Sequence, residues 1–204
     1  MTLYDLVAPL LYRIEPERAH SLGMFFMRFL RQQRFGDSSL ALKTKFGEIK
    51  NPIGLAAGFD KTGKHLSTLQ RLGFGYLVAG TITLEPWRGH PKPRIVRNIS
   101  EKTLVNSLGF PNPGAVAFIE NIRYQEIKVP LIASVSGRDM ASIVECYEKI
   151  QPFVAGIELN LSSPNTQNLK DLRENESFKP LAGKLLSIKK KPTYLKVPPF
   201  HDAE

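Results

Sequence analysis

Polar and charged side chains follow five short apolar runs of this 204-residue sequence, each at the point where a run ends. Lysine supplies a cation, asparagine supplies a donor and an acceptor in a fixed orientation, and serine and threonine hydroxyls both donate and accept hydrogen bonds. Collected in one place, such side chains predict a site for a small polar ligand. The five segments are Ala57-Gly58-Phe59-Asp60-Lys61, Gly80-Thr81, Ser134-Val135-Ser136-Gly137, Asn160-Leu161-Ser162-Ser163-Pro164-Asn165-Thr166 and Lys196.

Each of these residues also has an interpretation without a ligand. Asn160 and Asn165 are residue types that favour turns, where their amides bond to nearby backbone. Lys61 and Lys196 are interpretable as solvated surface charges, although a lysine on an interior strand needs an anion or another partner. The glycines of the first two segments permit tight backbone, and equally let a flat ligand approach it. Only the combination of all five segments favours a binding site.

The elements that must position these residues alternate along the chain from about residue 40. Short apolar runs predict strands at Ile53–Ala57, Tyr76–Gly80, Leu131–Val135, Gly156–Asn160 and Thr193–Val197. Helical spacing predicts helices between them at Lys64–Leu72, Ala115–Ile122, Met140–Ile150 and Phe178–Ile188. This alternation indicates parallel strands joined by right-handed crossovers. In barrels of parallel strands the reactive groups lie at the carboxyl ends of the strands, so we expect the five segments on one rim.

A long stretch, Glu85–Gly109, breaks this rhythm with prolines, glycines and two short β-like runs, Ile95–Arg97 and Thr103–Val105. Insertions of this length tend to carry function.

Two amphipathic helices are predicted before the alternating region. The large apolar residues of the first 14 positions fall on one helical face, and a second helix begins at Pro16 and carries an apolar stripe to Leu30. Basic residues follow or flank the end of this stripe, at Arg28, Arg31 and Arg34. Such a pattern is typical of an element that lies in a membrane interface. The alternative, which the spacing alone favours, is a helical pair that packs its apolar face on the next domain.

Composition excludes several classes of partner and of metal or disulfide site. With 42% hydrophobic and 23% charged residues the chain has the composition of a globular domain, and its basic residues, which give a net charge of +9, are spread without any nucleic-acid-binding motif. We therefore predict no nucleic-acid partner. The single cysteine, Cys146, excludes a disulfide framework and a multi-thiolate metal site, so we predict a reducing compartment and no metal. A buried helical position for Cys146 is favoured over a catalytic thiol.

Neither a membrane-spanning segment nor a cleaved signal is predicted. No apolar run reaches the ~18 residues that a spanning helix needs. Charged residues interrupt the first 18 positions, and no small-residue cleavage pattern follows them.

Several segments, in this order and spacing, resemble the dihydroorotate dehydrogenases along almost the whole chain. They are Asn51-Pro-Ile-Gly-Leu-Ala-Ala-Gly-Phe-Asp-Lys-Thr-Gly63, Leu72-Gly-Phe-Gly75, Gly80-Thr81, Pro91-Lys-Pro-Arg94, Asn106-Ser-Leu-Gly-Phe110 and Asn160-Leu-Ser-Ser-Pro-Asn-Thr166. The resemblance implies an α/β fold, a (β/α)8 TIM barrel of the FMN-dependent type. It also implies a flavoprotein oxidoreductase that oxidises dihydroorotate to orotate in de novo pyrimidine (UMP) biosynthesis.

Two features resemble the quinone-dependent class of that family. Ser163 stands where the soluble class has a cysteine base, and the segment from Leu11 to His20 resembles the helical pair that leads a membrane quinone to the flavin. The resemblance implies residues 1–38 as membrane-associating quinone-tunnel helices and residues 39–204 as a partial FMN-binding barrel. It implies a peripheral protein on the cytoplasmic side of the cell membrane, with His20 and Arg97 on the quinone side. The alternatives are the soluble class 1 enzyme and a non-catalytic half-barrel.

The resemblance also implies individual roles. Ser163 is the expected catalytic base. Amides and backbone groups expected to hold the pyrimidine ring of the substrate are at Asn106, Leu108, Gly109, Phe110, Asn160 and Asn165. Groups expected against the flavin are at Ala57, Gly58, Lys61, Thr81, Ser134, Asn160 and Lys196, with Lys61 serving both ligands. Two positions depart from the family pattern: Ser107 replaces an arginine, and Ser134 replaces an asparagine.

Five predicted strands account for only part of an eight-stranded barrel, which typically needs about 250 residues. We therefore expect a barrel cut short after about five strands, without the phosphate site that loops after strands seven and eight usually form. On its own, such a chain is expected to show little FMN-dependent turnover.

Overall fold

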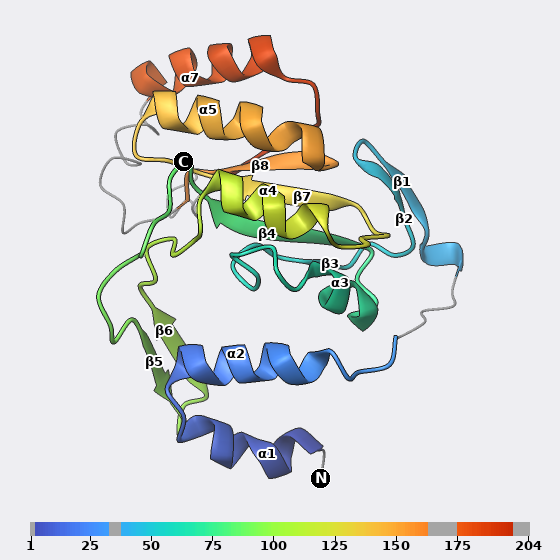
Figure 1. Ribbon diagram of the computed structural model, residues 1–204, viewed down its shortest axis with the longest axis vertical. Helices are drawn as coiled ribbons and strands as arrows, with labels where there is room; N and C mark the ends of the chain where they lie inside the picture. Colours follow the sequence, from blue (N-terminus) through green and yellow to red (C-terminus); the bar gives the residue numbers. More distant parts are fainter. Residues whose placement is uncertain (1–2, 33–37, 163–174, 198–204) are drawn as a thin grey trace, which may run out of the picture.

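Five parallel strands form the centre of the fold in the computed structural model, which describes residues 3–32, 38–162 and 175–197. In spatial order they are β3 (Gly54–Leu55), β4 (Tyr76–Ile82), β7 (Leu131–Val135), β8 (Gly156–Asn160) and β9 (Thr193–Lys196). The sheet curls like one side of a barrel (Figure 1). Because β7 is buried along its whole length, its sequence is a continuous run of small and apolar residues rather than an alternating one.

Helices cover the outer face of this sheet and supply the core (Figure 1). They are α3 (Leu66–Leu69) with the 3-10 turn η2 (Gln70–Leu72), α4 (Ala115–Arg123), α5 (Met140–Ile150) with the turn η3 (Gln151–Phe153), and α7 (Asn175–Ile188). Each presents an apolar stripe to the strands, as helical spacing requires. The core side chains that are fully enclosed include Leu77, Ile82, Phe118, Ile143, Tyr147, Ile157 and Leu181. At the start of α5, Asp139 and Ser142 form a reciprocal capping box that fixes where the helix begins.

A two-stranded hairpin closes the amino end of the sheet. It consists of β1 (Leu42–Thr44) and β2 (Gly47–Ile49), and follows a short 3-10 turn, η1 (Ser38–Leu40). Between the strands, the ring of Phe46 packs at 5.3 Å from Tyr76 and 5.9 Å from Tyr194. These aromatic contacts join the hairpin to the first residues of β4 and to β9.

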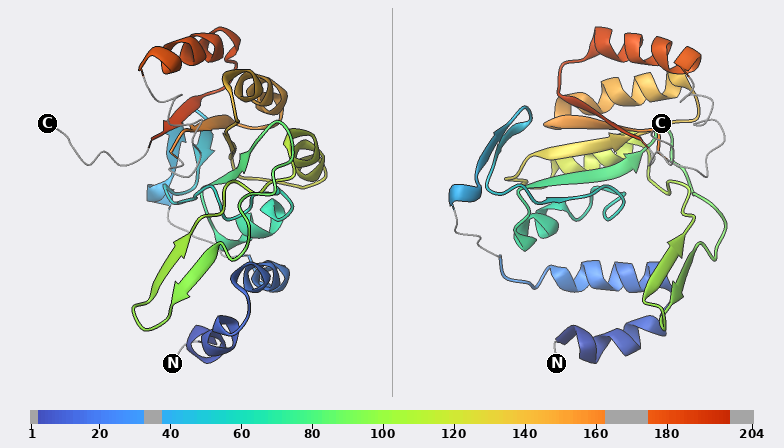
Figure 2. Two further views of the ribbon diagram at one scale, coloured as in Figure 1. Left: turned by 90° about the vertical axis from the view of Figure 1, so that its left-hand side faces the viewer. Right: turned by 180° about the vertical axis from the view of Figure 1, so that it is seen from behind.

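A second hairpin lies at the carboxyl end of the sheet and reaches toward the amino-terminal helices (Figures 1 and 2). It pairs β5 (Ile95–Asn98) with β6 (Thr103–Asn106). The helices are α1 (Leu3–Tyr12) and α2 (Pro16–Met27), which lie side by side on the opposite side of the sheet from α5 and α7 (Figure 2). None of the helices within residues 3–32, 38–162 and 175–197 is long and apolar enough to cross a membrane.

Ion pairs and hydrogen bonds attach the helical pair to the rest of the molecule. Glu17 of α2 receives two bonds from Arg94, Nη2 to Oε1 at 2.6 Å and Nε to Oε2 at 3.1 Å. Arg97 donates to the carbonyl oxygens of Leu11 and Ile14, each at 3.1 Å, and so binds the carboxyl end of α1. The hydrogen bond from the Arg94 guanidinium, helped by its charge, holds the pKa of the Glu17 carboxyl below its ordinary value, against the opposing effect of burial.

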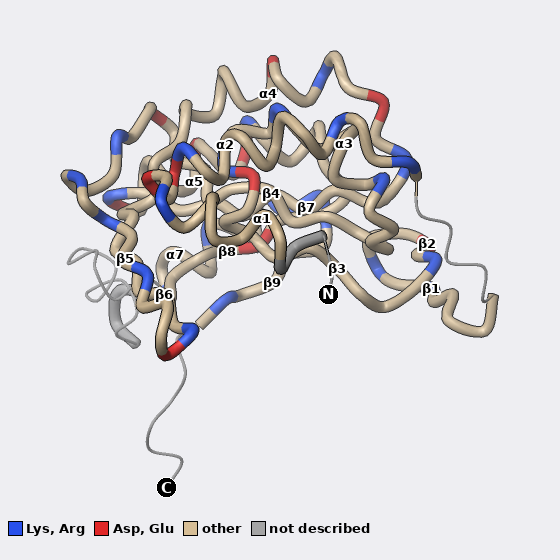
Figure 3. The backbone as a smooth tube through the Cα atoms, turned by 90° about the horizontal axis from the view of Figure 1, so that it is seen from below, with Lys and Arg blue, Asp and Glu red and all other residues tan. Residues whose placement is uncertain are grey.

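Most large apolar side chains of the helical pair are exposed, although Met24 belongs to the core and Met27 packs against it. Of the described residues here, Ala8, Ala19 and Met24 are buried, whereas Phe29 is 72% exposed. Other exposed apolar side chains of the same two helices are Leu6, Leu10, Leu22, Phe25 and Phe26. The basic residues of the chain are spread over many elements rather than gathered on one (Figure 3).

Most of the expected elements are present with small shifts of their ends, and the sheet is parallel as predicted. The first strand, β3, is shorter than expected, with only two residues. The fifth, β9, is the last strand of the described sheet, as a barrel cut short after about five strands requires, and Lys196 on it is exposed. The β1–β2 hairpin was not predicted.

Candidate active site

The carboxyl ends of the first two strands are joined through backbone hydrogen bonds. The Gly58 amide donates to Gly80 O at 2.7 Å, and the Gly80 amide donates to Asp60 O at 3.0 Å. Gly80 has a φ of +117°, and a Cβ there would lie 2.5 Å from the carbonyl oxygen of Ser134. Only glycine fits both the conformation and this close approach of β4 to β7. The first two polar segments therefore meet at one rim, as the sequence predicted.

A buried network connects the ends of β4, β7 and β8. The Asn160 side-chain amide donates to Thr81 Oγ1 at 2.7 Å, and Thr81 Oγ1 lies 3.2 Å from Ser134 Oγ. The Asn160 Oδ1 atom accepts from the Ser162 amide at 3.0 Å and from its hydroxyl at 2.7 Å. Ser136 donates its hydroxyl to Asn160 O at 2.9 Å. Three of the expected cofactor residues, Thr81, Ser134 and Asn160, are thus in direct contact.

Lys61 lies at the same rim, half-buried in the loop after β3. Its Nζ donates to Gly58 O. Burial lowers the pKa of the Lys61 ammonium, and the Glu17 carboxylate acts in the opposite direction. Asp60, which is buried, shapes the turn: one carboxylate oxygen accepts from the Thr62 and Gly63 amides at 2.9 Å, and the other accepts from the His65 amide at 2.8 Å. The turn fixed by Asp60 therefore sets the position of the Lys61 backbone at the rim.

Two features of this rim fit a flat ring with hydrogen-bonding edges, such as the isoalloxazine of FMN. Gly58 has a φ of +103°, and apart from its chain neighbours no described residue has an atom within 4 Å of the place where its Cβ would be, so a planar group can approach the backbone there. On β8, Glu158 Oε1 is buried and has no hydrogen-bond partner among the described residues. A buried carboxylate oxygen of this kind calls for a donor. Glycine backbone, amide, hydroxyl and ammonium groups are all suited to hold such a ring.

The helical pair touches this rim through His20. The His20 ring packs edge-on against Phe59 with 5.0 Å between ring centroids, and Phe59 is the neighbour of Gly58 and Asp60. Burial, followed by the nearby Lys61 ammonium, lowers the pKa of His20. A residue of α2 is therefore in contact with the loop that carries Lys61.

The expected substrate loop, residues 106–110, is supported by the segment before β5. Phe110 has a φ of +56° and packs edge-on against Trp87 at 6.4 Å between ring centroids. The guanidinium of Arg138, in the loop after β7, lies over the Trp87 ring, with Cζ 4.7 Å from the ring centroid. Buried Asn112 donates to Phe110 O at 2.8 Å and to Thr83 Oγ1 at 2.9 Å. Leu108, Gly109 and Phe110 are half-buried in this arrangement.

Several expected site residues are not brought together by the described contacts. Ser163 and Asn165 lie outside the described residues. Lys196 is exposed and stands beside Asn160 in the register of β8 and β9, so it lies on the same rim. Asn106 is exposed at the end of β6, and Ala57 is half-buried beside Gly58. Arg97 binds the end of α1, and lies over the Tyr12 ring at 5.9 Å.

Sequence reasoning missed Ser136, Asp60 and Asn112 as residues that organise the rim. Asp60 and Ser136 stood in the polar segments that the sequence singled out, but nothing in their types separated a ligand contact from an internal hydrogen bond. Asn112 is followed by Pro113-Gly114, a turn signal that identified a loop without indicating its bonds to Phe110 and Thr83.

Comparison with known proteins gives one consistent family. Residues 39–204 match the profile of the family described as "Dihydroorotate dehydrogenase". A protein of Acinetobacter baumannii named "Dihydroorotate dehydrogenase (quinone)" is 36% identical over 187 residues, which cover 86% of this chain and 56% of that protein. One of the same name from Alkalilimnicola ehrlichii is 32% identical over 203 residues, covering 92% and 59%. The chain thus spans a little over half the length of these relatives.

A solved structure gives the same result for the fold. The crystal structure of DHODH in complex with ferulenol from Eimeria tenella superposes with a TM-score of 0.79 at 25% identity, over 89% of this chain and 59% of that one. The ligand-free type from the same organism gives 0.75 at 28% identity, over 84% and 52%. The curled five-stranded parallel sheet therefore corresponds to part of the barrel of those proteins.

Proposed function

Because this chain belongs to the dihydroorotate dehydrogenase family, we propose that the protein oxidises dihydroorotate to orotate with FMN and passes the electrons to a membrane quinone. The observation that carries the proposal is the rim at the carboxyl ends of the strands. There Thr81, Ser134 and Asn160 are linked by hydrogen bonds, and Lys61 donates to the carbonyl oxygen of Gly58, beside the open backbone of that glycine. The relatives named above carry the quinone in their names, which favours this acceptor over those of the soluble class.

FMN would supply the acceptor for a hydride removed from one ring carbon of the substrate. Ala57, Gly58, Thr81 and Ser134 would line its ring, and Lys196 would stand at its edge beside Asn160. Fixed donors and cations in a partly dry site stabilise negative charge that develops during reaction. The rigid Asp60 turn and the Thr81–Asn160 bond give the site this fixed geometry before any ligand enters.

The substrate contacts follow from charge and hydrogen-bonding type. Lys61 is the described cation nearest to Gly58, so it is suited to bind the carboxylate of dihydroorotate. Amides pair well with the alternating donors and acceptors of a pyrimidine ring, the role assigned to Asn106, Asn160 and Asn165. Backbone groups of Leu108, Gly109 and Phe110 would complete the grip.

Ser163 would act as the base that removes a proton from the ring carbon next to the one that loses the hydride. A serine hydroxyl is a weak acceptor at neutral pH, so it needs a neighbouring acceptor or a water path. A general base contributes roughly 10²–10⁴-fold to a rate, so Ser163→Ala should lower kcat by about this factor with little change in KM.

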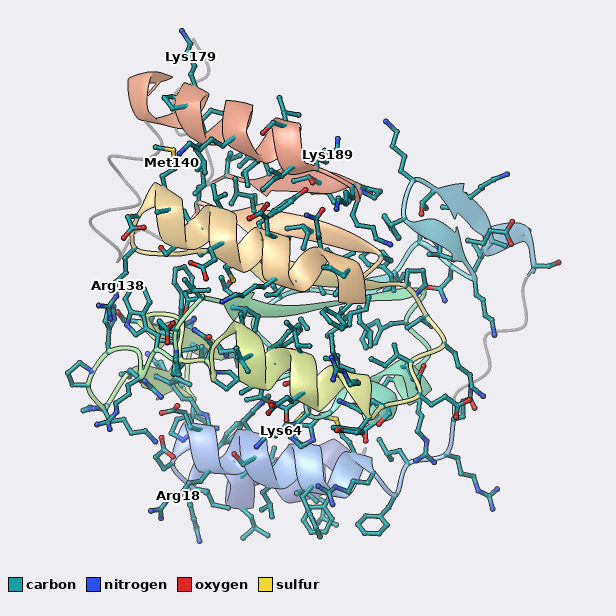
Figure 4. All side chains as sticks on the ribbon, turned by 45° about the horizontal axis from the view of Figure 1, so that its top comes forward. Arg18, Lys64, Arg138, Met140, Lys179 and Lys189 are labelled. Carbon is teal, nitrogen blue, oxygen red and sulfur yellow. The ribbon has the colours of Figure 1, made fainter. Side chains whose placement is uncertain are left out.

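The helical pair would bind the membrane surface and admit the quinone. Its exposed apolar residues, with Phe29 at 72% exposure, and basic residues such as Arg28 and Arg18 suit an element lying in the interface of an anionic membrane. Arg18 projects from this pair at the edge of the molecule (Figure 4). His20 and Arg97 would stand on the quinone side, where His20 contacts Phe59 next to the flavin loop.

The proposal is tested by assaying electron acceptors. Since the curated relatives are longer than this chain, the assay uses the protein expressed from its complete reading frame, purified with its flavin. Dihydroorotate oxidation is followed with a ubiquinone analogue, with fumarate and with NAD⁺. We expect turnover with the quinone analogue alone. Turnover with fumarate or NAD⁺ and none with the quinone would favour the soluble class, and none with any acceptor would overturn the enzyme assignment.

Membrane binding is tested separately by sedimentation with vesicles. We expect binding to vesicles that contain anionic phospholipid, weakened by Phe29→Ser, whereas Phe153→Ser, at an exposed aromatic residue of η3 on the barrel, should bind like wild type. Equal sedimentation of wild type with and without vesicles would contradict a role for the helical pair at the membrane.

A further inference from the structure

The loop of residues 106–110 has an unusual support at the position where this chain departs from the family pattern. Ser107 stands where the family commonly has arginine, and the ring of His90 occupies the space beside it. The His90 Nδ1 atom lies 2.9 Å from Ser107 O and 2.9 Å from Ser107 Oγ. His90 comes from the segment before β5, so the contact joins two separate parts of the chain.

The chemistry of this contact fixes the tautomer of the imidazole. A carbonyl oxygen only accepts, so the bond to Ser107 O forms in the tautomer that carries its hydrogen on Nδ1, and we assign that tautomer to His90. The same ring packs on the backbone of Gly109, since a Cβ at Gly109 would lie 2.7 Å from His90 Cδ2. Gly109 also has a φ of +66°, a conformation that favours glycine. The imidazole thus bonds to one residue of the loop and covers another.

Backbone bonds on both sides make this contact part of a rigid unit. The His90 amide donates to Leu108 O at 3.0 Å, and the Ser107 amide donates to Arg94 O at 2.9 Å. The Arg94 guanidinium in turn donates to His90 O at 3.0 Å and to Glu17 of α2. The loop is therefore held from the segment before β5, and that segment is held from the helical pair.

We propose that His90 is a positioning residue that holds residues 106–110 in the conformation that binds the substrate. This inference rests on the proposed function, which assigns Asn106 and the backbone of Leu108, Gly109 and Phe110 to the pyrimidine ring. In this chain the Nδ1–H of His90 ties the backbone at Ser107, whose short side chain leaves room for the imidazole. The ring orients the loop without touching the substrate.

The test compares His90→Leu with His90→Asn in the flavin-loaded protein expressed from its complete reading frame. Leucine fills similar space and has no donor, whereas the side-chain nitrogen of asparagine can replace Nδ1 as a donor. Glu101→Ala, at an exposed residue of the turn between β5 and β6, is the matched control. Orotate is titrated with the emission of Trp87, the single tryptophan of these 204 residues, which packs on Phe110 at the end of the loop.

We expect His90→Leu to weaken orotate binding roughly 5–30-fold, the equivalent of one lost, partly buried hydrogen bond and its unpaired carbonyl, with His90→Asn and Glu101→Ala within about threefold of wild type. Exchange of the Ser107 amide hydrogen should be faster in His90→Leu and normal in His90→Asn, a readout that needs no turnover.

Failure of the positioning role and failure of the proposed function give different results. If wild type and His90→Leu bind orotate equally, or if His90→Asn binds as weakly as His90→Leu, the positioning role is overturned and the proposed function is untouched. If wild type itself binds no orotate, the proposed function is overturned, and this inference with it.

Discussion

Replacing Thr81 by valine tests whether the buried network at the rim holds the strand ends together. Thr81 is 4% exposed, accepts from the Asn160 amide at 2.7 Å and pairs with Ser134 Oγ at 3.2 Å. Valine keeps the shape and removes the hydroxyl. Each neutral hydrogen bond contributes about 1 kcal/mol, and a buried donor without a partner costs about 1–3 kcal/mol. Because the Asn160 amide stays buried, we expect a loss of about 2–4 kcal/mol in the free energy of unfolding.

This loss is measured by urea unfolding followed through Trp87 fluorescence, with FMN and without it, since a ligand that binds only the folded state adds stability by mass action. At about 2–4 °C per kcal/mol for a domain of this size, Tm should fall by roughly 4–16 °C. Thr103→Val in β6, at an exposed threonine, should stay within about 0.5 kcal/mol of wild type. A Thr81→Val protein as stable as the Thr103→Val control would refute the reasoning.

Three further outcomes are expected. Burial raises the pKa of the Cys146 thiol to about 12, so native protein should not react with a thiol reagent at neutral pH and should react fully once unfolded. Rapid labelling of Cys146 in the native protein would contradict its burial. Gly80→Ala should lower the unfolding free energy by more than about 2 kcal/mol in urea melts, because its Cβ meets the Ser134 backbone and its φ is positive; wild-type stability would contradict this. The Arg94 hydrogen bond holds the pKa of Glu17 below its usual 4.5, so the stability that this bond adds is present above pH 4.5 and is lost as the pH falls through the lower folded pKa. Thermal melts of Glu17→Gln should therefore differ from wild type near neutrality and converge with it in acid. A difference that stays constant with pH would argue against the ion pair.

The parallel sheet and most of its helices were predictable because their signals are local and strong. The buried run Leu131–Val135 has no polar alternation, and α5 has apolar residues at helical spacing behind a capping aspartate, so both have the predicted bounds. The β1–β2 hairpin was missed because its three-residue strands are mostly exposed and carry little periodicity. Its position depends on Phe46 meeting Tyr76 and Tyr194, contacts that only the folded chain creates.

The rim was predictable as a set of strand ends, but its internal bonds were not. Residue type suggested Thr81, Ser134 and Asn160 as ligand contacts, and the structure adds that they bond to one another. The support of the loop by His90 could not be foreseen, because a lone histidine in a proline-rich segment carries no pattern and its partner Ser107 is 17 residues away.

We propose that Lys61 and the strand ends bring dihydroorotate together with a flavin. Anaerobic mixing of the flavin-loaded protein with dihydroorotate tests this arrangement. With no other acceptor present, wild type should lose its oxidised-flavin absorbance. The control is Lys64→Met, at an exposed lysine three residues further on (Figure 4), and it should lose the absorbance like wild type. Lys61→Met should retain the absorbance at matched substrate concentration. A wild-type flavin that stays oxidised, or a Lys61→Met flavin that bleaches as fast as wild type, would contradict the account.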